Sequence, residues 1–158
     1  MSNLLNKKAP AVNLPDENGG DLSLADFKGQ YILLYFYPKD MTPGCTEEAQ
    51  CLRNRMNDLK ALNVQVIGVS ADSSESHKKF RLKERLNFPL LSDVDKKVIQ
   101  EYGVWKEKNF MGKKFMGISR ESFLIDPKGV IVKHYEKVKP AEHAEEVISD
   151  VKMLRDMR

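Results

Sequence analysis

Two short apolar runs on either side of a helical pattern constrain the fold most strongly. The runs "YILLYFY" (31–37) and "VQVIGVS" (64–70) are rich in β-branched and aromatic residues, and each predicts a buried strand. Between them, apolar residues recur at helical spacing, which predicts one helix from near Cys45 to about Leu62. Strand, helix and strand in this order indicate a right-handed βαβ unit with parallel strands.

The second half of the chain alternates helical and strand patterns. Helices are predicted around 74–86 and 95–102, and the segments "SFLID" and "VIVKHY" flank "PKG", which is typical of a hairpin with Pro127 and Gly129 in its turn. A closing amphipathic helix is expected to begin at Pro140, because proline suits the first helical position.

A βαβ half followed by an antiparallel hairpin and a closing helix predicts an α/β protein with a thioredoxin-like fold, in which helices flank a central mixed β-sheet. The 158 residues fit one domain, 1–158, and no linker or repeat divides them. The segment "PDENGG" predicts a tight turn between two short N-terminal strands.

Charge and hydropathy restrict the partners. The net charge of +3 arises from 26 basic and 23 acidic residues spread along the chain, which argues against a nucleic-acid or membrane partner. The segment "MSNLLNKKAPAVNLP" lacks the apolar core of a signal peptide, and no later run approaches the roughly 18 apolar residues of a membrane span. We therefore expect a cytoplasmic protein with a small substrate.

The two cysteines are Cys45 and Cys51. A structural disulfide is disfavoured in a reducing cytoplasm, so the pair indicates redox chemistry, half of a metal site, or two unrelated buried thiols. Cys45 follows a Thr-Pro-Gly turn at the expected helix start, where unpaired N–H groups favour the thiolate, so it is a candidate nucleophile. The alternative is a small buried apolar residue, against which the polar neighbours Thr42 and Thr46 argue.

The segment "YFYPKDMTPGCTEEA" resembles the active-site motif of peroxiredoxins, since Pro38, Thr42 and Cys45 match the pattern Pro-x-x-x-Thr-x-x-Cys. With "LSLADFKGQ", "FPLLSDVDKKV" and "SRESFLIDPKG", the likeness covers nearly the whole chain and is to the bacterioferritin comigratory protein (Q-type) branch. It implies a monomeric thiol peroxidase without cofactor or metal. Such an enzyme reduces hydrogen peroxide and small organic hydroperoxides through a sulfenic acid on Cys45 and is recycled by thioredoxin.

The resemblance also assigns roles to site residues. Cys45 attacks the peroxide, Thr42 supplies a hydroxyl donor, and Pro38 shields the thiolate from water. Arg120, just before a predicted core strand, would lower the thiolate's pKa and hold a peroxide oxygen. Composition alone would instead make Arg120 a solvated charge at a strand edge.

Two aromatic residues and one segment have open assignments. Tyr37 and Trp105 are candidates for lining the site, although aromatic residues at such positions are more often plain core. The segment "WKEKNFMGKKFMGISR" is expected to be a loop that overhangs the site or helps to dock the reductant. A nucleic-acid patch is disfavoured there because Glu107 interrupts the basic run.

The resolving cysteine departs from the family pattern. The branch usually places it five residues after the first, where this chain has Gln50, and Cys51 lies one residue later. Six helical residues separate Cα atoms by roughly 9 Å and side chains by about 120°, whereas a disulfide spans at most about 7 Å. Cys51 is therefore a possible resolving cysteine, in an atypical intramolecular disulfide that requires the helix to open. The alternatives are a one-cysteine peroxidase, or a redox sensor that relays oxidation to a partner protein.

Two other classes are disfavoured by cysteine and histidine spacing. A metal site could combine the cysteines with His77, His134 and His143, but no C-x-x-C or H-x-x-x-H spacing occurs. A thioredoxin-type disulfide reductase would need its second cysteine three residues after Cys45, where Glu48 stands.

Overall fold

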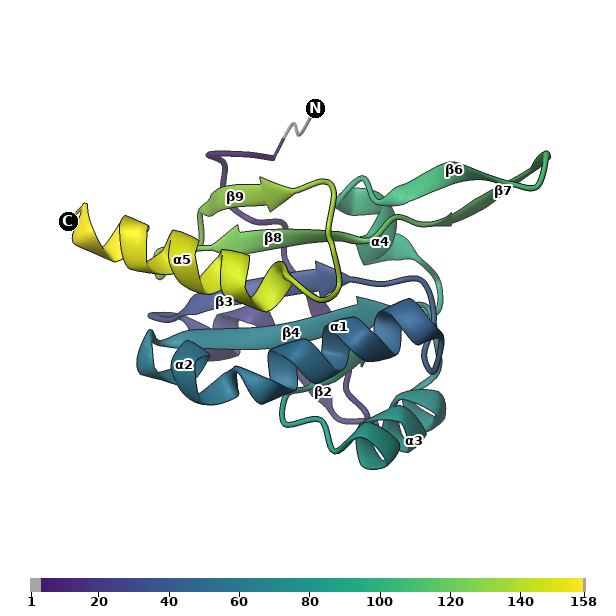
Figure 1. Ribbon diagram of the computed structural model, residues 1–158, viewed down its shortest axis with the longest axis horizontal. Helices are drawn as coiled ribbons and strands as arrows, with labels where there is room; N and C mark the ends of the chain where they lie inside the picture. Colours follow the sequence, from purple (N-terminus) through teal and green to yellow (C-terminus); the bar gives the residue numbers. More distant parts are fainter. Residues whose placement is uncertain (1–3, 158) are drawn as a thin grey trace.

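A five-stranded mixed sheet forms the centre of the computed structural model, which describes residues 4–157 (Figure 1). Its strands, in spatial order, are β5 (Leu90–Ser92), β4 (Val64–Ser70), β3 (Tyr31–Phe36), β8 (Glu121–Ile125) and β9 (Ile131–Tyr135). β3, β4 and β5 run parallel, whereas β8 is antiparallel to both β3 and β9. The mixed sheet, the parallel βαβ unit and the β8–β9 hairpin confirm the predicted α/β fold.

Both faces of the sheet are covered. α1 (Pro43–Asn54), α2 (Met56–Ala61) and α5 (His143–Asp156) cover one face, and Figure 1 shows them in front of the strands. The other face packs against α4 (Lys97–Glu101) and the N-terminal segment with β1 (Asn13–Pro15), β2 (Asp21–Ser23) and the 3-10 helix η1 (Leu24–Phe27). β1 and β2 pair across the predicted "PDENGG" turn.

Burial on both faces explains the continuous apolar run of β3. Its side chains alternate between the faces, so Tyr31, Leu33 and Tyr35 enter one core cluster while Ile32 and its alternate neighbours enter the other. The strand therefore shows no polar alternation. Throughout residues 4–157, no helix has both the length and the apolar character needed to cross a bilayer.

Helix boundaries differ from the prediction at several points. The helix expected over 45–62 starts earlier, at Pro43, and is interrupted at Arg55, whose N–H approaches the carbonyl groups of both Cys51 and Leu52. The last helix begins at His143 rather than Pro140, because residues 140–142 form a turn closed by N–H groups that donate to Lys139 O.

The two middle helices are shorter than predicted. α3 (Ser74–Glu84) ends where Arg85 adopts φ 53°, and α4 starts only after Lys96, which has φ 61°. Left-handed residues stop the helical hydrogen-bond pattern.

The loop prediction for the segment that begins at Trp105 is wrong. Its residues form a two-stranded antiparallel hairpin, β6 (Trp105–Phe110) and β7 (Lys113–Ile118), which projects from the end of the sheet where β8 begins (Figure 1). The connecting residues Met111 and Gly112 both have positive φ, 53° and 80°, as the tight turns that match strand twist require. Methionine is not a usual residue for such a turn, which explains why the turn was not predicted.

Candidate active site

Cys45 lies in the first turn of α1, as predicted. Thr42 is the N-cap residue and Pro43 is the first helical residue, so the N–H of Cys45 precedes the first hydrogen bond of the helix, which Thr46 donates to Thr42 O at 2.9 Å. The thiol is therefore held at the positive end of the helix dipole, where negative charge on sulfur is favoured.

The same thiol is buried, contrary to what its polar sequence neighbours indicated. Cys45 is 2% exposed and belongs to the core cluster beneath α1. Ala49 and Leu52 follow at helical spacing and are fully buried, so Cys45 is the first residue of the helix face that packs on the sheet. The polar neighbours gave the wrong expectation for Cys45 because they do not lie on the face of the helix that packs on the sheet.

Arg120 is brought to the thiol from a distant part of the chain. It precedes β8, whose first residue Glu121 pairs with Phe36 at the end of β3. The register of the sheet therefore places Arg120 at the start of α1. Its Nη2 lies 3.3 Å from Cys45 Sγ, and its side chain is only 19% exposed. Gly44 leaves room for it, since a Cβ there would lie 3.0 Å from Nη2. Arg120 is thus a half-buried partner of Cys45 and not a solvated edge charge.

Glu48 is a member of this cluster that sequence reasoning missed. Its Oε1 accepts a hydrogen bond from Arg120 Nη1 at 2.8 Å, and its side chain is fully buried. Oε2 has no hydrogen-bond partner among the described residues. Burial raises the Glu48 pKa to about 7, although the Arg120 charge and hydrogen bond oppose the rise. The sequence feature that could have identified Glu48 is its position three residues after Cys45, on the same face of the helix.

A second cation approaches the site from the hairpin. Lys108, on β6, is half-buried and its side chain lies across Gly117, where a Cβ would come within 3.1 Å of Lys108 Cδ. Burial and the positive charge of Arg120 lower the Lys108 pKa, while the charge of Cys45 opposes this shift. Lys108 is therefore within electrostatic reach of the site.

Thr42 and Pro38 lie on the loop that joins β3 to α1. Both are half-buried, and Thr42 Oγ1 donates a hydrogen bond to Lys39 O at 2.8 Å. Met41, between them, has φ 65°, an unfavourable conformation for a residue with a side chain. The loop is thus held in a strained shape immediately before Cys45.

Cys51 lies on the same unbroken helix as Cys45 but in a different environment. It is half-buried, and burial together with the charges of Glu47 and Glu48 raises its pKa. Both cysteines are free thiols. The neighbouring Gln50, at the usual resolving position of the branch, donates a hydrogen bond to Glu84 at 2.7 Å. Cys51 is therefore the more accessible of the two thiols.

The two aromatic candidates, Tyr37 and Trp105, pack on opposite faces of the sheet. Tyr37 shares the buried cluster of Cys45, and its ring stacks on Tyr35. Trp105 packs against the cluster on the opposite face of the sheet, with Lys96 Nζ 5.3 Å from its ring centroid. Of the pair, only Tyr37 is packed in the same cluster as the thiol.

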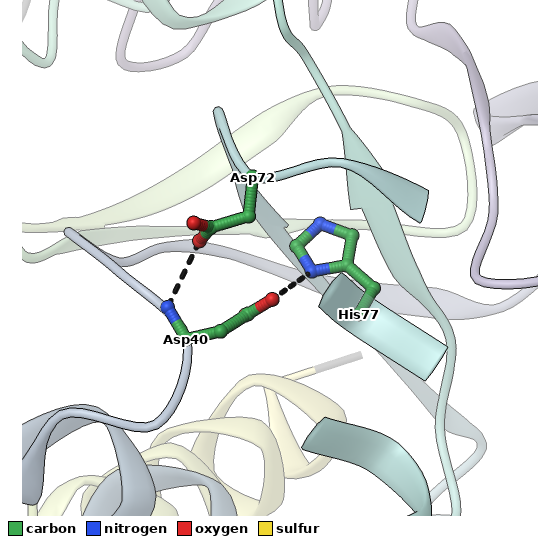
Figure 2. A group of neighbouring side chains, drawn as sticks. All are labelled: Asp40, Asp72 and His77. Carbon is green, nitrogen blue, oxygen red and sulfur yellow. Dashed lines mark hydrogen bonds and ion pairs between the residues drawn. The ribbon is translucent and has the colours of Figure 1, made fainter. Parts of the chain in front are cut away.

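A buried polar network anchors the loop between β3 and α1 (Figure 2). His77 Nδ1 lies 2.7 Å from Asp40 Oδ2, and the Asp40 N–H donates to Asp72 Oδ2 at 2.9 Å. Tyr37 and Ser76 also donate to Asp40, at 2.6 and 2.7 Å. Neither Asp40 nor Asp72 was identified from the sequence.

This network is also the group of side chains, among residues 4–157, whose spacing could hold a metal ion. It contains neither cysteine, so the combination of Cys45 and Cys51 with the histidines, which the sequence disfavours, does not assemble there. His134 and His143 bond elsewhere, to Glu121 and to Ser122. In the network itself, hydrogen bonds already occupy the atoms that would bind a metal.

The chain is similar to known proteins over most of its length. Residues 5–134 match the model of the AhpC/TSA family. It is 49% identical to Peroxiredoxin Bcp of Escherichia coli over 91% of this chain and 92% of that protein, and 45% identical to Peroxiredoxin Bcp of Bacillus subtilis over 94% of each.

Solved structures agree with the sequence comparison. A cysteine-to-serine mutant of Xylella fastidiosa PrxQ superposes with a TM-score of 0.88 at 35% identity, over 98% of this chain and 96% of that one. The Xanthomonas campestris bacterioferritin comigratory protein, described for its alkyl peroxide reduction activity, superposes with a TM-score of 0.84 at 37% identity over 90% of each chain. This chain therefore belongs to the AhpC/TSA family, as a thiol peroxidase of the bacterioferritin comigratory protein (Q-type) branch of the peroxiredoxins.

Proposed function

We propose that the chain reduces hydrogen peroxide and small organic hydroperoxides with Cys45 as the attacking thiolate. The contact between Arg120 Nη2 and Cys45 Sγ, at 3.3 Å in the first turn of α1, is the observation that carries this proposal. A cationic donor and a helix N-terminus both stabilise negative charge on sulfur.

The reaction proceeds as a displacement on oxygen. The Cys45 thiolate attacks one peroxide oxygen, an S–O bond forms, and the O–O bond breaks. The sulfur is oxidised to a sulfenic acid, and the departing oxygen leaves as an alcohol, or as water from hydrogen peroxide, after it takes up a proton. Arg120 donates to the oxygen that gains negative charge and stabilises the transition state.

Thr42 and Pro38 complete the proposed pocket. The one proton of the Thr42 hydroxyl is donated to Lys39 O, so its oxygen is available as an acceptor for the peroxide O–H. A donor role for Thr42 would require it to give up that bond. Pro38, half-buried on the same loop, limits the access of water to the thiolate.

We further propose that Cys51 resolves the sulfenic acid. Its thiol displaces water from the oxidised Cys45 and forms an intramolecular disulfide, which thioredoxin then reduces by taking up the oxidising equivalents as its own disulfide. The first turns of α1 must open for this step, since both cysteines belong to one continuous helix. The half-exposed position of Cys51 supports the assignment.

Intact mass after one equivalent of hydrogen peroxide tests the proposal, with a sulfenic-acid trap in a parallel sample. A loss of about two mass units and peptides linking Cys45 to Cys51 would support both steps. A trapped sulfenic acid without that loss would identify a one-cysteine peroxidase, or a sensor awaiting a partner thiol. If Cys45 does not react rapidly, the peroxidase assignment of Cys45 is wrong.

A further inference from the structure

Exposed apolar side chains gather on the β6–β7 hairpin. Phe110 and Met111 are 68% and 88% exposed, and Phe115 and Met116 are 48% and 49% exposed. The hairpin pairs with no other strand in the described chain, and it extends beyond the rest of the molecule (Figure 1). Such a concentration of apolar surface on a projecting element is typical of an interaction site.

The register of the hairpin separates its side chains into two faces. Lys108 is opposite Phe115, Phe110 is opposite Lys113, and Lys106 is opposite Gly117. Residues directly opposite share a face, and faces alternate along a strand. One face, here called the Lys/Phe face, therefore consists of Lys106, Lys108, Phe110, Lys113 and Phe115.

Negative charge on the hairpin is confined to the other face. Glu107 is opposite Met116 there, and its carboxylate lies 3.9 Å from Lys114 Nζ. The Lys/Phe face thus combines three lysines and two phenylalanines with no acidic residue. It is complementary to an acidic surface with an apolar centre, and it would repel a second copy of itself.

The Lys/Phe face begins close to the active site, because β7 ends at Ile118, two residues before Arg120. Lys106 Nζ lies 2.7 Å from Glu121 and so fixes the base of the hairpin to the first residue of β8. Lys108, on the same face, is close enough to Arg120 and Cys45 for both to act on its charge. A molecule bound to this face would therefore lie beside the reactive thiol.

We propose that the Lys/Phe face docks a dithiol protein reductant that presents an acidic rim around an apolar patch. This inference rests on the proposed function, because it concerns the protein that restores Cys45. In the docked complex a thiolate of the partner attacks the Cys45–Cys51 disulfide and releases one cysteine as a thiolate. The partner's second thiol then breaks the mixed disulfide, so the partner is oxidised to a disulfide and both cysteines are reduced.

The test compares two double variants on opposite faces of one hairpin. The first double variant, Phe110→Ser with Lys113→Glu, changes the Lys/Phe face near its tip. The second, Lys114→Glu with Met116→Ser, is its match on the other face: it also replaces one lysine by glutamate and one apolar residue by serine. Steady-state turnover is measured with thioredoxin and with dithiothreitol, at low and high salt. Single-turnover oxidation of Cys45 by peroxide serves as the measure of the basal chemistry.

The Lys/Phe variant is expected to raise the KM for thioredoxin by about tenfold or more. Its dithiothreitol turnover and Cys45 oxidation should stay within about twofold of the parent, because the tip lies away from the reacting atoms. The parent's KM should rise with salt, and this dependence should weaken in the variant. The opposite-face variant should behave like the parent.

Several outcomes would overturn the inference. An unchanged KM for thioredoxin in the Lys/Phe variant would do so, as would equal losses in both variants. The parent protein could float with phosphatidylglycerol vesicles while both variants fail to do so and keep an unchanged KM for thioredoxin. That result would assign the hairpin to a membrane surface. A hairpin-dependent dimer in sedimentation, again with unchanged KM, would assign it to a second copy.

Docking of a dithiol protein on the hairpin and the peroxidase role of Cys45 can be tested independently. Oxidation of the protein with diamide forms the disulfide without peroxide, so reduction by thioredoxin can be measured even if Cys45 does not react with peroxide. If dithiothreitol reduces this disulfide and thioredoxin does not, docking of a dithiol protein of this kind is excluded, whereas the peroxidase assignment of Cys45 stands.

Discussion

The fully buried carboxylate of Glu48 lies 2.8 Å from the guanidinium of Arg120, whose other terminal nitrogen contacts Cys45 Sγ. Glu48 thus fixes the orientation of the guanidinium while Nη2 remains directed at the sulfur. The pair joins α1 to the start of β8, so the thiol's environment depends on two segments far apart in the chain.

The Cys45→Ser variant should consume no peroxide, because serine at this position has no accessible oxyanion to attack the O–O bond. Cys51→Ser should keep the first turnover at the parental rate and lose thioredoxin-coupled cycling. Stopped-flow oxidation and a coupled thioredoxin assay measure the two steps. Parental steady-state cycling by the Cys51 variant would show that Cys51 is not the resolving cysteine.

Replacement of Arg120 by methionine should slow Cys45 oxidation by about a hundredfold, since it removes the donor that stabilises charge on the departing oxygen. Arg155→Met, at an exposed site on α5, is the matched control and should leave the rate unchanged. Second-order rate constants for hydrogen peroxide give the comparison. Similar rates for the two variants would argue against a direct role for Arg120.

The Gly44→Ala variant should disturb the same contact without removing a functional group. The new Cβ would lie 3.0 Å from Arg120 Nη2, so the guanidinium must move away from its present position. We expect Cys45 oxidation to slow by about tenfold with little loss of stability. Gly20→Ala is the control, since its Cβ would meet only Asp16 Oδ1 at 3.9 Å.

Glu48 should make stability depend on pH. Burial raises its pKa in the folded protein from an ordinary 4.5 to about 7. Between these values the folded state binds more protons than the unfolded state, so the free energy of unfolding should fall as pH rises from 4.5 to 7, by at most about 3 kcal/mol. In Glu48→Gln this part of the slope should disappear. Denaturant titrations at several pH values measure it, with exposed Glu47→Gln as the control that keeps the parental slope.

The network around Asp40 should contribute to stability through buried hydrogen bonds to the Asp40 carboxylate. His77 bridges two parts of the chain, since Nδ1 lies 2.7 Å from Asp40 Oδ2 and Nε2 lies 2.9 Å from Leu91 O. His77→Leu would remove both contacts inside the protein and should cost about 3 kcal/mol of unfolding free energy. Ser76→Ala, which removes one donor to Asp40, should cost only about 1 kcal/mol. Equal costs in denaturant titrations would contradict a larger contribution from His77 than from Ser76.

Local patterns in the sequence were sufficient to predict most strands of the central sheet and the helices around it. The apolar run at 64–70 coincides with β4, and the helix before it places Cys45 in its first turn. These features depend on side-chain periodicity and turn chemistry within short segments, which a sequence displays directly. The interruption at Arg55 and the hairpin turn at Met111 and Gly112 were not predicted, because arginine and methionine have no preference for the backbone conformations that they adopt there.

The candidate site could be predicted only through its motif. The spacing of Pro38, Thr42 and Cys45 on one loop and helix start is a local property, and the resemblance to peroxiredoxins added Arg120. Neither showed that Cys45 is buried or that Glu48 supports the guanidinium. Both facts follow from which side of α1 packs against the sheet.

The sequence by itself thus determined most of the helices and strands, the family motif and the position of the nucleophile at a helix N-terminus. Only the tertiary structure decided what surrounds that nucleophile. The antiparallel pairing of β8 with β3 brings Arg120, 75 residues later in the chain, to the thiol, and the hairpin that precedes β8 places Lys108 within electrostatic reach of both. Such long-range proximity is set by strand order and register, and burial together with the charge of Arg120 then lowers the pKa of Lys108.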